Sequence, residues 1–417
     1  MTTASGRCHR RADCRLCGST RVSQVLSLEP TPPANAFVPA AMLEQPQQCF
    51  PLDIFFCQDC SHVQMLDVVD PCELFENYVY VSGTSPVFVK HFENYAADIR
   101  ASFAPPARSL VVDIGSNDGT LLGFFGAAGH RVLGIDPARD IARIATEAGI
   151  ETLCGFFTRD LADTIRAGYG PAAVVTANNV FAHVDDLGDV ARGVRDLLAP
   201  EGVFVFEVSY LVDVFENTLF DTIYHEHLAY HSVKPLIGFL ARNGLELIEA
   251  FRVGSHGGSL RAVAQLQGGP RPVGGSVGAA LAEEARLGLD KAETFHAFAH
   301  HIDALKAELA ILLKRLKADG RRFAGFGAPA KATTLMYHFG LGADVIDYIV
   351  DDSPLKQGLY TPGLHIPVVS SSAIAERAPD YLLILAWNFA PSIIARHTTF
   401  RQGGGHFILP LPRVEVV

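Results

Sequence analysis

The run from Val111 to Leu122, which reads V-V-D-I-G-S-N-D-G-T-L-L, constrains the fold of this chain more than any other segment. Two β-branched residues lead into an acidic residue, a short polar turn lies between Gly115 and Gly119, and a leucine pair follows. This pattern predicts a buried strand, a tight turn and the start of a helix. Glycine at both ends of the turn leaves room for a ligand to lie against the backbone. The spacing differs from the G-x-G-x-x-G of dinucleotide-binding loops.

Strand and helix patterns alternate on both sides of this run, which is typical of an α/β fold with a parallel sheet. Strands are expected over 109–114, 131–135, 173–177 and 202–208. A helical leucine pattern over 279–318 predicts one or two long helices. Beyond it, a second strand–turn–helix pattern at 322–331 and strands over 345–350, 381–387 and 406–411 predict a smaller α/β domain.

The chain has 417 residues, which is too long for one hydrophobic core, so several domains are expected. We expect an N-terminal zinc-binding domain over 1–70, a central Rossmann-like α/β domain over 71–254 and a C-terminal α/β domain over 255–417. The net charge of −11 argues against nucleic acid as a partner. No apolar stretch of about 18 residues and no signal peptide is found, so a cytoplasmic protein without a membrane span is expected.

Two cysteine pairs, Cys14 with Cys17 and Cys57 with Cys60, form the pattern C-x-x-C…C-x-x-C. Each pair can wrap two thiolates around one metal ion, and four thiolates at tetrahedral positions suit Zn²⁺. With four protein ligands the site is closed, so a structural role is expected.

The turn after the first strand is similar to D/E-x-G-x-x-x-G, the first motif of S-adenosylmethionine (SAM)-dependent methyltransferases. The resemblance implies that the turn binds the amino-acid end of SAM through Asp113, Gly115, Asn117 and Gly119. Asp136 ends the next strand about 20 residues on, where a carboxylate can accept hydrogen bonds from ribose hydroxyls. Phe156 is expected to pack on the adenine. Asn178 and the residues up to 185, His183 among them, are expected to line the same cleft.

A dense group of acid–base residues over 221–231 follows the strand at 202–208. Tyr224, Glu226 and His227 offer a phenol, an orienting carboxylate and a base whose ordinary pKa is near neutral. Two other interpretations of these histidines stay open. The histidines of this segment can ligate a metal, although their spacing does not match H-E-x-x-H. They can also be buried structural histidines.

The order of several motifs along the chain resembles the SAM-dependent sugar C-methyltransferases of antibiotic deoxysugar biosynthesis. The motifs are the four cysteines, the turn at 113–119, Y-H-E-H at 224–227, H-G-G-S-L-R at 256–261, G-F-G-A-P-A-K at 325–331 and A-W-N at 386–388. The resemblance implies His227 as the catalytic base, with Tyr224 and Glu226 beside it. It also implies a tyrosine of the segment 78–80 in the site, for which Tyr78 is preferred over Tyr80.

The resemblance implies a nucleotide-linked substrate, a thymidine-diphosphate 4-keto-6-deoxy sugar that is methylated at the carbon beside the ketone. His227 would remove the proton, and Tyr224 or His183 would stabilise the enolate. Arg261, Lys331 and Lys356 are candidates for binding the diphosphate. The alternatives are an O- or N-methyltransferase of another small metabolite and a binding protein with an unused methyltransferase fold. A monomer and a homodimer are both compatible with the sequence.

Overall fold

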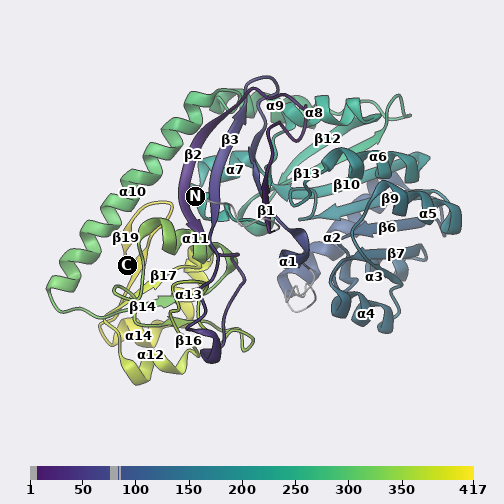
Figure 1. Cartoon of the computed structure of the whole chain (residues 1–417). Helices are drawn as coiled ribbons and strands as arrows, with labels where there is room; N and C mark the ends of the chain where they lie inside the picture. The colour runs from purple at the N-terminus through teal and green to yellow at the C-terminus, as the bar shows by residue number, and fades with distance from the viewer. Residues whose placement is uncertain (1–6, 76–82, 84–85) are drawn as a thin grey trace. The chain divides into compact units, whose positions relative to one another are not determined.

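The computed structural model describes residues 7–75, 83 and 86–417, and the chain forms two compact units (Figure 1). The first unit consists of Met1–Ser23, Phe55–Val212 and Leu228–Lys291. The second consists of Gln24–Ile54, Asp213–His227 and Ala292–Val417. Each unit is therefore assembled from segments that are far apart in the sequence.

A seven-stranded sheet with the order β12-β13-β10-β9-β6-β7-β8 organises the first unit. Its five strands from β10 to β8 are parallel, whereas β13 is antiparallel to both β10 and β12. The strands are β6 (Leu110–Ile114), β7 (Arg131–Asp136), β8 (Thr152–Cys154), β9 (Ala172–Asn178), β10 (Leu198–Ser209), β12 (Leu245–Val253) and β13 (Ser259–Leu266). All five residues of β6 are buried, as expected for a parallel strand that is covered on both faces.

Helices connect these strands and complete the first unit. They are α1 (Pro71–Phe75), α2 (Pro86–Phe103), α3 (Thr120–Ala127), α4 (Arg139–Glu147), α5 (Arg159–Tyr169), α6 (Leu187–Leu197), α8 (Val233–Arg242), α9 (Gly275–Leu287) and η4 (Ser255–Gly257). One core cluster joins α2, α3 and the central strands through buried residues such as Tyr95, Phe125, Val111 and Val205. The sheet is thus fixed by apolar packing close to the predicted turn.

Two smaller strand groups surround the cysteines. The strand β1 (Cys8–Arg10) pairs with β5 (Asp67–Val69), and a four-stranded sheet has the order β11-β4-β3-β2. Its strands are β2 (Val22–Thr31), β3 (Phe50–Cys57), β4 (Val63–Met65) and β11 (Ala229–Tyr230). Two of these strands are long, because β2 has 10 residues and β3 has 8.

The second unit contains a six-stranded sheet with the order β16-β15-β14-β17-β18-β19, parallel except for β19. Its strands are β14 (Phe323–Phe326), β15 (Ile349–Val350), β16 (Val368–Val369), β17 (Tyr381–Ile384), β18 (His406–Leu409) and β19 (Glu415–Val416). Its helices are α7 (Leu211–Glu216, which begins in the first unit), α10 (Ala292–Ala318), α11 (Ala330–Phe339), α12 (Ser372–Arg377), α13 (Ala390–Arg396), α14 (Thr398–Gln402), η1 (Ala40–Met42), η3 (Phe220–Thr222) and η5 (Trp387–Phe389).

The expected α/β class and parallel sheets are confirmed, and most differences concern the lengths of elements. The strand predicted over 345–350 is reduced to β15, and the strand predicted over 381–387 ends at Ile384. The helical region at 279–318 is two helices, because the chain breaks between Leu287 and Ala292. Among the described residues, no helix combines the length and the apolar character needed to cross a membrane.

Candidate active site and zinc centre

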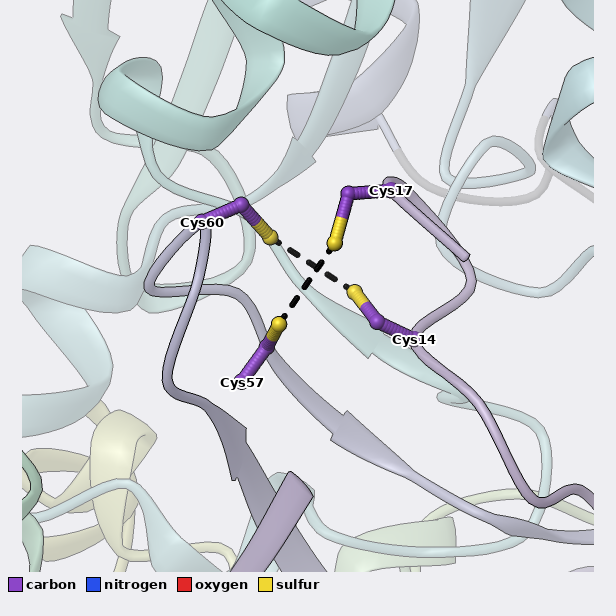
Figure 2. A group of neighbouring side chains, drawn as sticks. All are labelled: Cys14, Cys17, Cys57 and Cys60. Atoms are coloured by element: carbon purple, nitrogen blue, oxygen red, sulfur yellow. Dashed lines mark hydrogen bonds between the residues drawn. The ribbon is translucent and has the colours of Figure 1, made fainter. Parts of the chain in front are cut away.

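The four cysteines converge on one point, as Figure 2 shows. Their sulfur atoms all lie within 4.8 Å of one another, with 3.6 Å between Cys14 and Cys60 and 3.5 Å between Cys17 and Cys57. Zn–S bonds of about 2.3 Å in a tetrahedron place sulfurs about 3.8 Å apart, so the cluster has the size of a zinc site. The positive φ of Gly18, 72°, allows the first knuckle to turn. The donor set therefore fits one structural Zn²⁺.

Arg15 lies between two of these cysteines, and sequence reasoning missed its role. Its side chain is fully buried and donates hydrogen bonds to the carbonyls of Met65 (2.8 Å) and Leu228 (3.1 Å). It also pairs with Asp185, at 3.2 Å. Burial lowers the pKa of Arg15 to about 10. Through Arg15, the cysteine-containing segment therefore holds Leu228, which follows His227. It also holds Asp185, in the loop after β9 that contains His183.

The turn after β6 has the conformation that the glycine spacing predicted, but for a further reason. Gly115 and Gly119 have φ values of 70° and 77°, which favour glycine. A Cβ at Gly115 would lie 2.2 Å from the Val180 side chain, and one at Gly119 would lie 2.9 Å from Ile150. The neighbouring side chains therefore require glycine at both positions. This requirement is separate from the space that the glycines leave for a ligand.

The two acidic residues of the expected cofactor site are both engaged. The carboxyl of Asp113 accepts a hydrogen bond from Thr176 Oγ1 at 2.6 Å, and burial raises its pKa to about 7. Asp136 accepts hydrogen bonds of 2.9 Å from the backbone N–H groups of Asn117 and Ala138. Since a carboxylate has about four lone-pair positions, Asp136 retains acceptor capacity for a ribose hydroxyl.

Several polar groups near this turn remain without partners. Helix α3 has Gly119 at its N-cap, which offers no side chain to cap the helix. The N–H of Thr120 donates to Asp118 Oδ1 at 3.2 Å, so the N–H groups that follow Thr120 in the first turn are the ones that can bind an anion. Within the described part of the chain, buried Ser116 Oγ and both polar atoms of the Asn178 side chain have no hydrogen-bond partner. Asn178 lies at the end of β9, next to β6 in the sheet. A polar ligand with a carboxylate and hydroxyls, such as SAM, fits this set.

The remaining residues expected in the cofactor cleft differ in their surroundings. Phe156 is 40% exposed, so its ring is available for contact with a ligand. The imidazole of His183 stacks on Phe75, with 5.7 Å between the ring centroids. Tyr78 and Tyr80 lie outside the residues that the structure describes.

His227 ends a tight turn that begins in η3, within the second unit. Its ring Nδ1 is 2.7 Å from the carbonyl oxygen of Thr222, and its backbone N–H donates to Tyr224 O at 2.8 Å. Since a carbonyl can only accept, Nδ1 carries the proton and Nε2 keeps a lone pair. Burial lowers the pKa of His227 to about 4, so the ring is neutral at pH 7.

The two other members of the expected catalytic group flank this ring. The Tyr224 and His227 rings have centroids 4.2 Å apart. Glu226 is buried, and its Oε1 accepts a 2.9 Å hydrogen bond from Asn35, which sequence reasoning missed. His225 points elsewhere, with its Nε2 3.3 Å from the Phe50 carbonyl. Among the described residues, no group of three or more cysteine, histidine, aspartate or glutamate side chains at this turn is placed to hold one metal ion.

The three predicted phosphate-binding cations all have protein partners. Lys331 Nζ is 3.5 Å from Asp221 Oδ2, and Lys356 Nζ donates to Ala328 O at 2.7 Å. Arg261 belongs to the first unit, where its Nε donates to buried Glu207 at 2.6 Å. Its guanidinium thus neutralises a buried carboxylate, and the role of Arg261 in binding the diphosphate stays a prediction.

Family models match the chain in three consecutive segments. A "Putative zinc binding domain" matches residues 14–75, a "Methyltransferase domain" matches 88–250 and a "C-methyltransferase C-terminal domain" matches 254–412. The C-methyltransferase NovU of Streptomyces niveus is 36% identical over 405 residues, which cover 97% of this chain and 96% of NovU.

Solved structures resemble part of the chain. The CcbJ methyltransferase from Streptomyces caelestis covers 42% of this chain and 89% of its own, with 16% identity and a TM-score of 0.34. A SAM-dependent methyltransferase from Clostridium acetobutylicum covers 43% of this chain and 92% of its own, with 11% identity and a TM-score of 0.34.

Proposed function

Because this chain belongs to the C-methyltransferase family that includes NovU, we propose that its substrate is a nucleotide-linked 4-keto-6-deoxy sugar. The enzyme is a SAM-dependent C-methyltransferase with a zinc-binding domain. In the proposed reaction a methyl group is added to the carbon beside the ketone. We propose thymidine diphosphate as the nucleotide because the sequence motifs resemble those of sugar C-methyltransferases that act on thymidine-diphosphate sugars.

The orientation of His227 is the observation that carries this proposal. A methyl group is added to carbon only when the carbon is nucleophilic, and a proton beside a ketone is acidic because the enolate spreads its charge onto oxygen. His227 offers a neutral Nε2 to take that proton, while the Thr222 carbonyl keeps Nδ1 protonated. Because burial lowers the pKa of His227 to about 4, Nε2 carries no proton at neutral pH and can accept one.

The neighbouring residues have proposed roles that follow from their chemistry. The Tyr224 hydroxyl is a donor for the developing enolate oxygen, and buried Glu226 orients the segment. His183 remains a second candidate donor. When bound, SAM supplies an electrophilic methyl group. The chain's proposed contribution to its binding is the α3 N-terminus, Ser116, Asp136 and Asn178 in the first unit.

The diphosphate is proposed to bind to the loop between β14 and α11 in the second unit. Helix α11 has ten residues, its N-cap Pro329 carries no capping side chain, and its first N–H groups can therefore bind an anion. Lys356 contacts this loop through Ala328 O, and burial lowers the pKa of Lys356. Asp351 accepts a hydrogen bond from Ala328 N on the same loop, and its charge is offset by the ammonium group of Lys356.

A methyl-transfer assay in D₂O tests this function. Wild type is mixed with SAM and a panel of thymidine-diphosphate 4-keto-6-deoxy sugars, and the products are analysed by mass spectrometry. We expect one methyl group on carbon, with deuterium exchange beside the ketone. His227→Ala should reduce both by about 10²- to 10⁴-fold. His296→Ala, on an exposed position of α10, is the matched control.

Three outcomes separate the alternatives. Methyl transfer that survives in His227→Ala would assign the base to another residue. Transfer to oxygen or nitrogen, without exchange of the carbon-bound proton, would support the O- or N-methyltransferase. Binding of SAM without transfer to any ketosugar would contradict the proposed substrate class.

A further inference from the structure

Asp221 is a fully buried carboxylate directly before Thr222, whose carbonyl receives the ring N–H of His227. We propose that Asp221 is a positioning residue for the base: held by Trp387 and Lys331, it fixes the Thr222 carbonyl and thereby keeps His227 in the tautomer with a basic Nε2. This inference rests on the proposed role of His227. It goes further because it assigns a function to the A-W-N segment at 386–388.

The contacts of Asp221 come from two elements of the second unit. The indole N–H of Trp387 donates to Asp221 Oδ2 at 2.7 Å. Lys331 Nζ lies 3.5 Å from the same oxygen and 4.5 Å from the centroid of the Trp387 ring. The three side chains therefore form one interlocked group in which the lysine is attracted to both the carboxylate and the aromatic face.

The same turn is fixed at two further points. Thr334 Oγ1, on α11, donates to the carbonyl of Ile223 at 2.7 Å. The ring of Phe220 packs against that of Phe339, also on α11, with 5.2 Å between centroids. The carbonyls of Thr222 and Ile223 are thus held by two different side chains, His227 and Thr334. Because the turn is short, a shift of Asp221 would move the Thr222 oxygen directly.

Burying an aspartate at this position costs free energy that an apolar side chain would not cost. Burial raises its pKa, and its second oxygen, Oδ1, has no hydrogen-bond partner among the described residues. A buried charge with one partner removed is strongly unfavourable, whereas an apolar side chain would pack without that cost. In some proteins a buried ionic group is retained for the geometry that it fixes, and here we propose that this geometry is the position of the Thr222 carbonyl, which selects the His227 tautomer.

The test uses the whole enzyme and two variants of different severity. Trp387→Phe removes the indole N–H and keeps an aromatic ring for Lys331, whereas Asp221→Asn removes the charge. Glu284→Gln is the matched control, because Glu284 is also a buried carboxylate and accepts hydrogen bonds from Tyr210, Val233 N and Lys234 N in the first unit.

The first readout is the tautomer of His227, measured by NMR of ¹⁵N-histidine-labelled enzyme without substrate. A His227→Gln spectrum identifies the signal among the 16 histidines. We expect a single Nδ1–H tautomer in wild type and in Glu284→Gln. In Trp387→Phe and Asp221→Asn we expect a mixture of tautomers.

The second readout is steady-state kinetics together with the Kd of SAM. We expect kcat to fall about tenfold or more in Trp387→Phe, in line with the cost of a misplaced catalytic group, and the Kd of SAM to remain unchanged. The inference is overturned if Trp387→Phe folds and keeps the wild-type tautomer and kcat. A wild type with the expected tautomer but no methylation of ketosugars would contradict the proposed function and leave the positioning of His227 intact.

Discussion

Asn35 and Glu226 are 191 positions apart in the sequence, yet the side-chain amide of Asn35 donates a 2.9 Å hydrogen bond to Glu226 Oε1. Glu226 is 4% exposed and precedes His227, so its carboxylate depends on partners inside the protein. Asn35 follows the proline-rich loop after β2. A loop from the N-terminal region therefore helps to hold the segment that carries the proposed base.

Removing this donor should weaken both stability and catalysis. For Asn35→Ala we expect the free energy of unfolding in urea to fall by about 1–3 kcal/mol, because a buried carboxylate loses a partner. We also expect kcat to fall while the Kd of SAM stays constant. Gln47→Ala is the control: Gln47 is another amide of the second unit, and it donates to Ala36 O instead of to Glu226. Equal losses in the two variants would contradict a specific role for Asn35.

The turn after β6 should tolerate no side chain at Gly115. Gly115→Ala meets two obstacles, a φ of 70° and a contact of 2.2 Å with Val180. We expect a loss of unfolding free energy of about 2–4 kcal/mol, the sum of backbone strain and overpacking. Gly129→Ala shares the positive φ, 87°, but has no atom within 4 Å of the added Cβ, so it measures the strain alone. Gly115→Ala/Val180→Ala should recover the packing part, and no recovery would show that the contact is unimportant.

Acid should destabilise the protein through its buried histidines. Burial lowers the pKa values of His225 and His231 to about 4, whereas in the unfolded chain a histidine has a pKa of about 6.5. Between these values the unfolded state binds more protons, so the free energy of unfolding decreases as the pH falls. Each histidine contributes about 3 kcal/mol over the full window.

Urea unfolding from pH 7.5 to pH 4.5 measures this dependence. The slope should be smaller in His231→Gln than in wild type, because one proton fewer is taken up on unfolding. His300→Gln, at an exposed position of α10, should keep the wild-type slope. A slope that is the same in all three proteins would locate the acid sensitivity in other groups.

Zinc removal should affect more than the cysteine knuckles. Cys57 is fully buried in the cluster, and Cys57→Ser should lose the one zinc ion per chain that mass spectrometry is expected to detect in wild type. The melting temperature should fall, because metal binding contributes directly to folding. Since Arg15 holds the Leu228 carbonyl, kcat should fall as well. Cys154→Ser, at an exposed cysteine, should retain the metal. A zinc-free wild type would contradict this prediction.

Local patterns in the sequence predicted the fold class because the required information lies within short segments. The glycines at 115 and 119 and the paired cysteines specify backbone turns through their own conformations and spacing. The strands β6, β7, β9 and β10 were recognised for a similar reason, since buried parallel strands are continuous apolar runs. The strand β15 is shorter than predicted, because Val345, Ile346 and Tyr348 just before it are also apolar but do not join the sheet.

The partners of the candidate site residues could not be predicted in the same way. Asn35, Arg15 and Trp387 act on residues more than 160 positions away, and one sequence contains no signal for such pairs. Chemistry gave one indication of the pair Trp387 and Asp221, because a buried tryptophan N–H and a buried carboxylate each require a hydrogen-bond partner. The positive charge of Arg261 suggested phosphate, and its partner within the protein, Glu207, is the one acidic residue of the strand predicted over 202–208.

The interleaving of the two units has a consequence for how the enzyme is made. The chain passes from one unit to the other five times, at residues 23, 54, 212, 227 and 291. The turn that carries His227 receives its hydrogen bonds from Thr334 and Trp387, which a ribosome adds more than a hundred residues later. During synthesis the first unit can acquire its strands while this turn still lacks its supports. The proposed base is thus among the last parts of the molecule to mature, and a nascent chain remains without its oriented imidazole until the C-terminal sheet has formed.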